Sequence, residues 1–201
     1  MLPLGSLVSD LQNGWSPKCL PRPANSDEWG VLKLGAVSFG VFNQEENKAL
    51  PQGMKPLPEL EVRKAEVLIS RANIHRYVGA CVEVRETRPR LLLCDKIFRV
   101  VFRTPSPILP TYLVEIVRTP HLRHQIENAL TGTSPTMKNI TKASLLQLQV
   151  PVPRLGVQQK IVEMVNDKRA RIAEERRTAE ARQAQTTREM EEMILGIRPI
   201  G

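Results

Sequence analysis

The chain has 201 residues, 41% of them hydrophobic, which is enough for a sizeable buried core and argues against extensive disorder. A formal net charge of +8 and an isoelectric point near 9.8 favour an anionic partner, such as nucleic acid or an acidic membrane surface, with a basic protein lacking such a partner as the plainer alternative. No window holds the roughly 18 apolar residues of a membrane span, and Cys19, Cys81 and Cys94 fit neither a disulfide framework nor a CxxC metal site, so we expect a soluble, cytoplasmic protein.

Short apolar runs separated by prolines predict many brief elements rather than a helical bundle. All but one of the sixteen prolines lie in the first 153 residues. Between them, β-branched or alternating apolar runs predict strands at residues 31–37, 66–70, 80–84, 91–102 and 145–152.

Two short helices are expected between the last two of these strands. One begins at Pro110, and the other follows Thr119 and Pro120, which offer an N-cap and a first-turn proline. An irregular mixture of strands and helices predicts an α+β domain with a mixed sheet.

After residue 154 the composition changes to that of one long helix. Residues 158–195 contain neither proline nor glycine and predict a helix of about 57 Å. A thin apolar seam with a seven-residue period runs along it, and such a seam on a charged helix needs a partner helix. Its repeating members are Val165, Ile172, Ala179, Thr186 and Met193, with Ile161 beside the first of them.

The excess positive charge belongs to the first part of the chain. Residues 155–201 carry nine Lys and Arg against eight Asp and Glu, which leaves a net charge of +7 for residues 1–154. A basic globular part is typical of an anion-binding body, whereas a balanced tail is typical of a solvated helix. We therefore expect a globular domain over residues 1–154 and a coiled-coil-type helix over residues 155–201.

The stretch EVLISRANIHRYVGA, residues 66–80, begins as a buried strand and then presents hydrogen-bonding side chains. Arg, Asn, His and Ser are residue types that recognise base edges in the major groove of DNA. A polar loop over a strand end is an equally compatible alternative. The candidate DNA-binding residues here are Ser70, Arg71, Asn73, His75 and Arg76.

A second candidate is the stretch TGTSPTMKNIT, residues 131–141. Its backbone N–H groups, hydroxyls and cation suit phosphate contacts, although an ordinary loop is as compatible with this composition. It lacks the GxxxxGK[ST] pattern of a nucleotide-hydrolysing loop. Its candidate DNA-binding residues are Thr131, Ser134, Lys138 and Asn139.

Other clusters carry little chemistry. His121 and His124 lie three residues apart on a predicted helix, but no further ligand is placed nearby in the sequence to complete a metal site. Four aromatic residues are expected in or against the core rather than in a base-stacking platform. They are Trp15, Trp29, Phe39 and Phe42.

Several pieces, taken in order, resemble the specificity subunit of type I restriction-modification enzymes over nearly the whole chain. They are WGVLKLGAV, FNQEENKALP, EVLISRANIHRYVGA, LLLCDKIFRVVF, ENALTGTSPTMKNIT and LLQLQVPVPRLGVQQKIVEMV. In that family a globular target recognition domain reads one half of a split DNA site. A helix then pairs with its counterpart and docks methyltransferase subunits. The resemblance implies one such domain in residues 1–154 and one such helix in residues 155–201.

Full-length members of that family carry two recognition domains and two helices, whereas this chain has one of each. The resemblance therefore implies a homodimer in which the helix pairs antiparallel with that of a second copy and presents two identical readers to a split palindrome. The residues expected at this contact are Ile161, Val165, Ile172, Ala179 and Met193.

The expected function is that of a DNA-binding specificity subunit of a type I DNA adenine methyltransferase complex. Its expected partners are double-stranded DNA, methyltransferase subunits and, in a restriction system, a restriction subunit. No catalytic residue, metal or cofactor is expected in this chain, since S-adenosylmethionine would be bound by the methyltransferase subunit. The alternative is a non-catalytic interaction or structural module with nonspecific DNA affinity.

Overall fold

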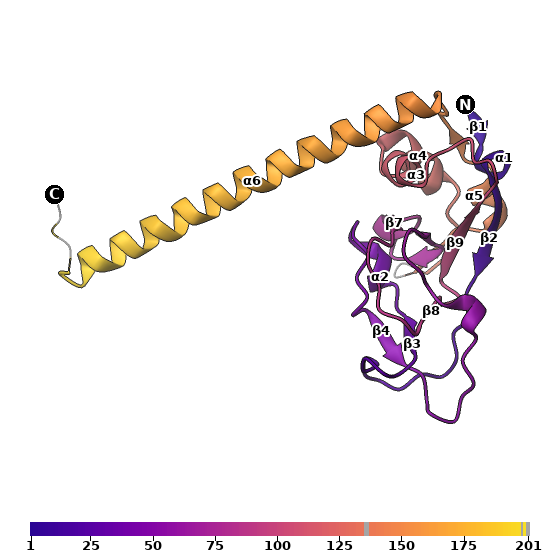
Figure 1. Ribbon diagram of the computed structural model, residues 1–201, viewed down its shortest axis with the longest axis horizontal. Helices are drawn as coiled ribbons and strands as arrows, with labels where there is room; N and C mark the ends of the chain where they lie inside the picture. The colour runs from indigo at the N-terminus through magenta and orange to yellow at the C-terminus, as the bar shows by residue number, and fades with distance from the viewer. Residues whose placement is uncertain (135–136, 198, 200–201) are drawn as a thin grey trace. The chain divides into compact units, whose positions relative to one another are not determined.

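The computed structural model describes residues 1–134, 137–197 and 199, and divides the chain into two compact units, Met1–Gln158 and Gln159–Gly201. The first unit mixes short strands and short helices, and the second consists mainly of one helix (Figure 1). The predicted class, an α+β domain with a mixed sheet followed by a long C-terminal helix, is confirmed.

A four-stranded antiparallel sheet forms the centre of the first unit. Its strand order is β2 (Val8–Asn13), β9 (Ile97–Phe102), β5 (Val67–Ser70) and β7 (Cys81–Glu83). Strand β5 has a neighbour on both edges and is buried at all four positions. Its first three residues are large and apolar without alternation, which is typical of a strand covered on both faces.

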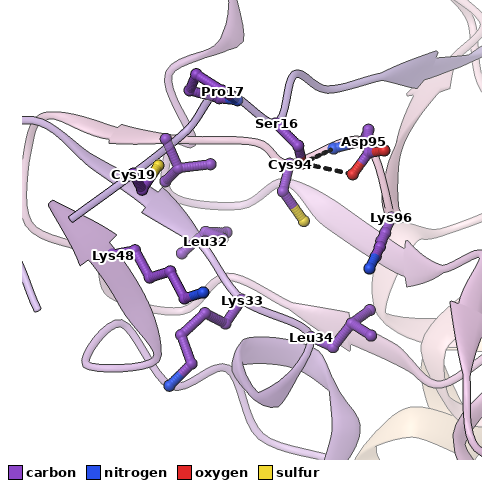
Figure 2. A pocket seen from close by; sticks show the side chains of 11 residues that line it. Ser16, Pro17, Cys19, Leu32, Lys33, Leu34, Lys48, Cys94, Asp95 and Lys96 are labelled. Atoms are coloured by element: carbon purple, nitrogen blue, oxygen red, sulfur yellow. Dashed lines mark hydrogen bonds between the residues drawn. The ribbon is translucent and has the colours of Figure 1, made fainter. Parts of the chain in front are cut away.

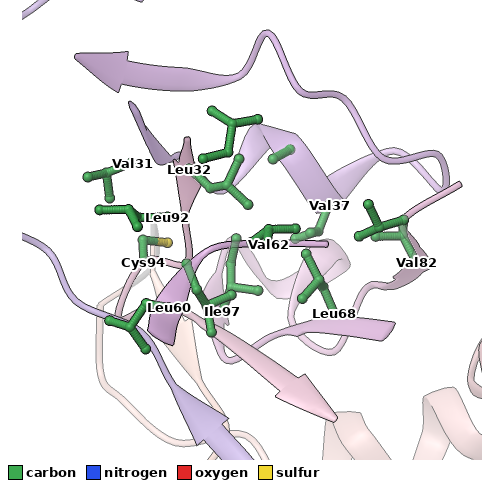
Figure 3. Packing of buried hydrophobic residues seen from close by; sticks show 14 of the residues in the cluster. Val31, Leu32, Val37, Leu60, Val62, Leu68, Val82, Leu92, Cys94 and Ile97 are labelled. Carbon is green, nitrogen blue, oxygen red and sulfur yellow. The ribbon is translucent and has the colours of Figure 1, made fainter. Parts of the chain in front are cut away.

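A smaller sheet lies beside it, in the order β4 (Asn47–Ala49), β3 (Gly30–Leu32) and β8 (Leu91–Leu92). Strands β3 and β4 are antiparallel, whereas β3 and β8 are parallel. Figure 3 shows the apolar cluster that joins the two sheets, with Leu68 and Ile97 from the first sheet and Leu32 and Leu92 from the second. All four side chains are almost completely buried.

Two further strand pairs connect segments that are far apart in the sequence. Strand β1 (Leu2–Pro3) pairs with β11 (Gln149–Val150), so the first residues of the chain lie beside the last strand of the unit. Strand β6 (Ala72–Asn73) pairs with β10 (Lys138–Asn139). The short helix α1 (Leu4–Leu7) leads from β1 into β2.

The two predicted helices are confirmed as α3 (Pro110–Val117) and α4 (Pro120–Asn128). Each has proline in its first turn, and α3 lies against β7 (Figure 1). Thr119 precedes α4 as expected, but its hydroxyl donates to the carbonyl of Ile116 instead of capping the helix. The remaining helical turns are α2 (Gly35–Ser38), α5 (Lys142–Leu146), η1 (Pro58–Leu60) and η2 (His75–Tyr77).

Three predicted strands differ from the structure. Of the strand predicted at residues 31–37, only Val31 and Leu32 belong to a strand, β3. The chain then turns into α2, which buries Ala36 and Val37. Residues 91–102 form two strands in different sheets, because Asp95 and Lys96 interrupt the run at its most polar point.

Residues 145–152 are the third difference. Thr141 caps a helical turn by accepting a hydrogen bond from the N–H of Ser144 at 3.0 Å, so Leu145 belongs to α5 and only Gln149–Val150 is a strand. Leu145 and Leu148 are both buried. Residues three apart lie on the same side of a helical turn, so the turn buries these two leucines without the alternation of a strand.

The long helix α6 (Leu155–Ile194) has 40 residues and therefore a length of about 60 Å. The predicted helix is confirmed, and it begins three residues before the predicted start. None of the described helices is both long and apolar enough to cross a membrane.

Gln158, in the first turns of α6, is completely buried within the first unit. Its amide nitrogen donates to the carbonyls of Pro107 at 3.0 Å and Pro153 at 2.8 Å, and its amide oxygen accepts from the N–H of Leu109 at 2.8 Å. One buried side chain thereby satisfies the carbonyls of two prolines and the N–H of Leu109, the N-cap residue of α3.

Replacing Gln158 with Ala should therefore destabilise the first unit. The change leaves one N–H and two carbonyls without partners, and each buried unpaired group costs about 1–3 kcal/mol. We expect the free energy of unfolding to fall by about 2 kcal/mol or more in urea denaturation followed by tryptophan fluorescence, since Trp15 and Trp29 both lie in this unit.

The matched control is Gln159→Ala. Gln159 is exposed, and among the described residues its amide bonds to Glu163 alone, at 2.9 Å, so its removal should change the free energy of unfolding by less than about 0.5 kcal/mol. Equal losses in the two variants would contradict the role assigned to Gln158.

Candidate nucleic-acid interface

The loop that follows β5 is shaped by its own buried polar residues. Ser70 is completely buried, and its hydroxyl donates to the carbonyl of Tyr77 at 2.6 Å. The N–H of Gly79 donates to the carbonyl of Ser70 at 2.8 Å. Residues 70–79 therefore form a closed turn in which Ser70 holds the two ends together.

Asn73 is also buried and connects this loop to its neighbour. Its amide nitrogen donates to the hydroxyl of Ser38 at 2.9 Å, and its amide oxygen accepts from the N–H of Ile74 at 2.9 Å. The hydroxyl of Ser38 donates in turn to the carbonyl of Leu34 at 2.7 Å. Of the five candidate residues in this loop, Ser70 and Asn73 thus point their hydrogen-bonding groups into the protein.

The other three candidates in the loop reach the surface. His75 and Arg76 are exposed, and Arg71 is half-buried. The guanidinium carbon of Arg71 lies 5.6 Å from the ring centroid of Phe98, and that of Arg76 lies 5.6 Å from the ring of Tyr77. Both cations are therefore steadied by an aromatic face without being neutralised.

The second predicted loop lies directly beside the first. Strand β10 pairs with β6 so that Lys138 is opposite Asn73 and Asn139 is opposite Ala72. The N–H of Ile140 also donates to the carbonyl of Arg71 at 2.8 Å. The structure thus brings together two segments that the sequence analysis selected separately.

The second loop is closed at its base by backbone bonds between Thr131 and Asn139, at 2.8 and 3.0 Å. Lys138 is half-buried, and its ammonium donates to the carbonyl of Gly132 at 2.8 Å. Thr131 and Ser134 are exposed, whereas residues 135 and 136 of this loop lie outside the described part of the chain.

A third loop, residues 38–42, completes the surface. The sequence analysis did not select this loop as a candidate binding segment. Phe39 is 71% exposed, so its prediction as a core residue is wrong, and Val41 is 72% exposed. The Phe39 ring meets the Tyr77 ring edge-on, with 5.2 Å between their centroids. Hydrophobicity predicts burial, so no sequence signal indicated exposure. The other three aromatics pack against the core, namely Trp15, Trp29 and Phe42.

The charges of this surface are predominantly positive. Among the residues that the structure describes, Arg71, Arg76 and Lys138 have no carboxylate within ion-pair distance. Arg118, at the C-terminal end of α3, and Arg123, in α4, each lie 3.5 Å from a glutamate of the respective helix. Three unneutralised cations around adjoining loops suit a polyanion such as DNA.

A hollow of about 370 Å³ lies at the edge of the smaller sheet, where Lys33, Lys48 and Lys96 gather (Figure 2). Lys33 is paired with Glu46 at 2.9 Å. The carbonyl of Lys96 accepts the N–H of Arg71 at 2.9 Å, so the hollow adjoins the first loop.

Two cysteines also line this hollow. Burial raises the pKa of the Cys94 thiol to about 11, and burial raises the pKa of Cys19 despite the opposing charge of Lys48. Both thiols are therefore mostly protonated near neutral pH and are weak nucleophiles.

The two histidines considered above as metal ligands are hydrogen-bonded within their own helix segment. The Nε2 atom of His121 lies 3.1 Å from the amide nitrogen of Gln125, and the Nε2 atom of His124 lies 3.1 Å from that of Asn128.

Gly79 allows the first loop to close, and its replacement by Ala should disrupt it. Its φ is +73°, and an added Cβ would lie 2.9 Å and 3.0 Å from two side-chain carbons of Ile126. The left-handed backbone alone costs a residue other than glycine about 1–2 kcal/mol. We expect at least that loss in the free energy of unfolding. Gly53→Ala, with no atom within 4 Å of the added carbon, should be nearly neutral, and an equal effect there would contradict this account.

The chain resembles known proteins in sequence. No protein-family model matches it. It is 30% identical over 165 residues to the specificity subunit of the type I restriction enzyme EcoEI from Escherichia coli. The match covers 82% of this chain and 28% of that protein, so the chain spans less than a third of the curated relative's length.

Solved structures resemble it in fold. A chain from a study of complex assembly and conformational transition in the type I R-M system has a TM-score of 0.62 at 19% identity, covering 97% of this chain and 44% of that one. The HsdS subunit from Thermoanaerobacter tengcongensis has a TM-score of 0.58 at 17% identity, covering 88% and 38%. The S subunit from M. genitalium has a TM-score of 0.53 at 14% identity, covering 86% and 39%. The chain is therefore similar in sequence to the specificity subunit of a type I restriction enzyme, and it shares its fold with solved type I S subunits.

Proposed function

We propose that the chain is a DNA specificity subunit whose first unit reads one half of a bipartite target. The observation that carries this proposal is the meeting of residues 70–79 and 131–139 through the pairing of β6 with β10. Around these loops stand Arg71, Arg76 and Lys138, all without an ion-pair partner in the described chain. Similarity to type I specificity subunits supports the same function.

Within this proposal the loop residues have different roles. Arg76 and His75 are exposed and can approach base edges or phosphates, while Arg71 and Lys138 are held closer to the backbone. Ser70 and Asn73 act by fixing the loop, because their hydrogen-bonding groups are already engaged inside the protein. Thr131, Ser134 and Asn139 would add phosphate contacts at the rim of the second loop.

The long helix would serve as the contact with other subunits. Its charged surface carries an exposed apolar seam, in which Ile172 is 48% exposed. We propose that this seam pairs antiparallel with a second copy, and that the helix pair docks methyltransferase subunits and, in a restriction system, a restriction subunit. The remaining seam residues in this proposal are Ile161, Val165, Ala179 and Met193.

The chain itself would be non-catalytic in this complex. S-adenosylmethionine would be bound by the methyltransferase subunit, which would carry out transfer of the methyl group. The contribution of this chain is then to hold its loops on one DNA sequence and to position the partner. Methylation by the purified chain alone would contradict this division of roles.

Replacing Arg76 with Ala should weaken binding to the target. We expect a loss of about 1–3 kcal/mol with relaxed specificity if the guanidinium contacts a base, or a uniform loss and a salt slope reduced by about 1 if it contacts a phosphate. The same pair of outcomes applies to Arg71→Ala. Binding of the complex with methyltransferase to labelled duplexes at several salt concentrations distinguishes the two.

The matched control is Arg85→Ala, which removes an exposed cation from another part of the unit. It should leave target discrimination unchanged. If neither Arg71→Ala nor Arg76→Ala differs from this control in affinity or salt slope, the loop does not contact DNA. A wild-type complex that binds all duplexes equally would favour a nonspecific interaction module instead.

Replacing Ile172 with Glu should break the helix pair. A charge placed in an apolar seam loses hydration without gaining a partner, so we expect dimerisation to weaken at least about tenfold. Light scattering after size exclusion would show a dimer for the wild type and a monomer for the variant. Ala170→Glu, on the opposite side of the helix, should remain dimeric. A monomeric wild-type chain, alone and with methyltransferase, would reject the homodimer.

A further inference from the structure

Two large apolar side chains occupy the tip of the loop formed by residues 38–42, which we call the apolar loop. Phe39 is 71% exposed and Val41 is 72% exposed, and Ile74 on the adjoining loop is 47% exposed. Single exposed apolar residues are normal on protein surfaces, but a group of them marks a contact surface. All three belong to segments next to the cations described above.

The apolar loop is held in place on both sides. The Ser38 hydroxyl accepts from Asn73, and the Phe39 ring lies edge-on to Tyr77. The carbonyl of Gly40, a residue with φ of +80°, accepts a hydrogen bond from the guanidinium of Arg118. These contacts fix the backbone between the buried Ser38 and the half-buried Phe42, so the side chains of Phe39 and Val41 are presented to solvent in a defined arrangement.

The surroundings favour DNA over a protein partner as the occupant. The apolar loop is linked through Asn73 to Lys138 and adjoins Arg76, two cations without a carboxylate partner in the described chain. The cores of protein–protein contacts are depleted of charged residues, whereas DNA-reading surfaces combine cations with apolar contacts. In the major groove the apolar group available to such side chains is the 5-methyl group of thymine.

We propose that Phe39 and Val41 contact thymine methyl groups in the major groove, so that the apolar loop is a third reading loop beside residues 70–79 and 131–139. This inference rests on the proposed function. It assigns specificity to side chains that carry no hydrogen-bonding group. Its physical basis is removal of the methyl group and the apolar side chains from water on binding.

The experiment uses the full chain with its cognate methyltransferase subunit. The wild-type complex first selects its target from a random duplex library, and each thymine of the selected half-site is then replaced by deoxyuridine, which removes only the methyl group. We expect at least one replacement to weaken wild-type binding about three- to tenfold. The double variant Phe39→Ala, Val41→Ala should bind the unmodified target about tenfold more weakly and should not respond to that replacement.

Salt dependence provides an independent readout. Apolar side chains release no counterions, so the double variant should keep the wild-type salt slope, whereas a phosphate-contacting cation would change it. The control is Val101→Ala, which shortens a 37% exposed valine on strand β9 and should bind like the wild type.

Three results would overturn the inference. The first is an equal response of the wild type and the double variant to every deoxyuridine replacement, and the second is a selected half-site without thymine. The third is loss of methyltransferase binding in the double variant, which would make the apolar loop a protein contact. In each case the wild type still discriminates its target, so the proposed function stands. A wild type without discrimination would reject the proposed function itself.

Discussion

The buried amide of Asn73 is the interaction on which the candidate surface depends. It joins three segments, because its side chain bonds to Ser38 and to its own loop while its backbone pairs with Lys138. A buried polar side chain whose nitrogen and oxygen are both hydrogen-bonded is costly to displace, since its partners would be left unpaired. Asn73 therefore ties the three segments to one another at one buried point.

This arrangement separates the polar residues of one short segment into two kinds. The side chains of Ser70 and Asn73 are buried and hydrogen-bonded within the protein, whereas those of His75 and Arg76 are exposed to solvent. Side chains that are ordered before binding lose less conformational entropy on contact with a ligand. The aromatic faces of Phe98 and Tyr77 provide such order for two arginines without cancelling their charge.

The elements predicted correctly from the sequence are those that local sequence patterns determine. Strand β5 and helices α3 and α4 follow from a continuous apolar run and from first-turn prolines, and the long helix follows from composition. The strands predicted at residues 31–37 and 145–152 were wrong because the apolar residues there are buried on short helical turns, Ala36 and Val37 in α2 and Leu145 in α5, which a local apolar pattern does not distinguish from a strand. Both loops were selected from residue types, but their pairing is a long-range contact with no local signal. Phe39 was misplaced because hydrophobicity cannot separate a core residue from an exposed one.

The pairing of β1 with β11 has a consequence for how this unit can be combined with others. The first residues of the unit lie hydrogen-bonded beside its last strand, with Leu2 opposite Val150 and Pro3 opposite Gln149. A unit whose two ends adjoin can be spliced into a host polypeptide at a single point, because the host chain enters and leaves at the same place. Exchanging one such cassette for another would replace all three loops together and leave the host's own geometry undisturbed.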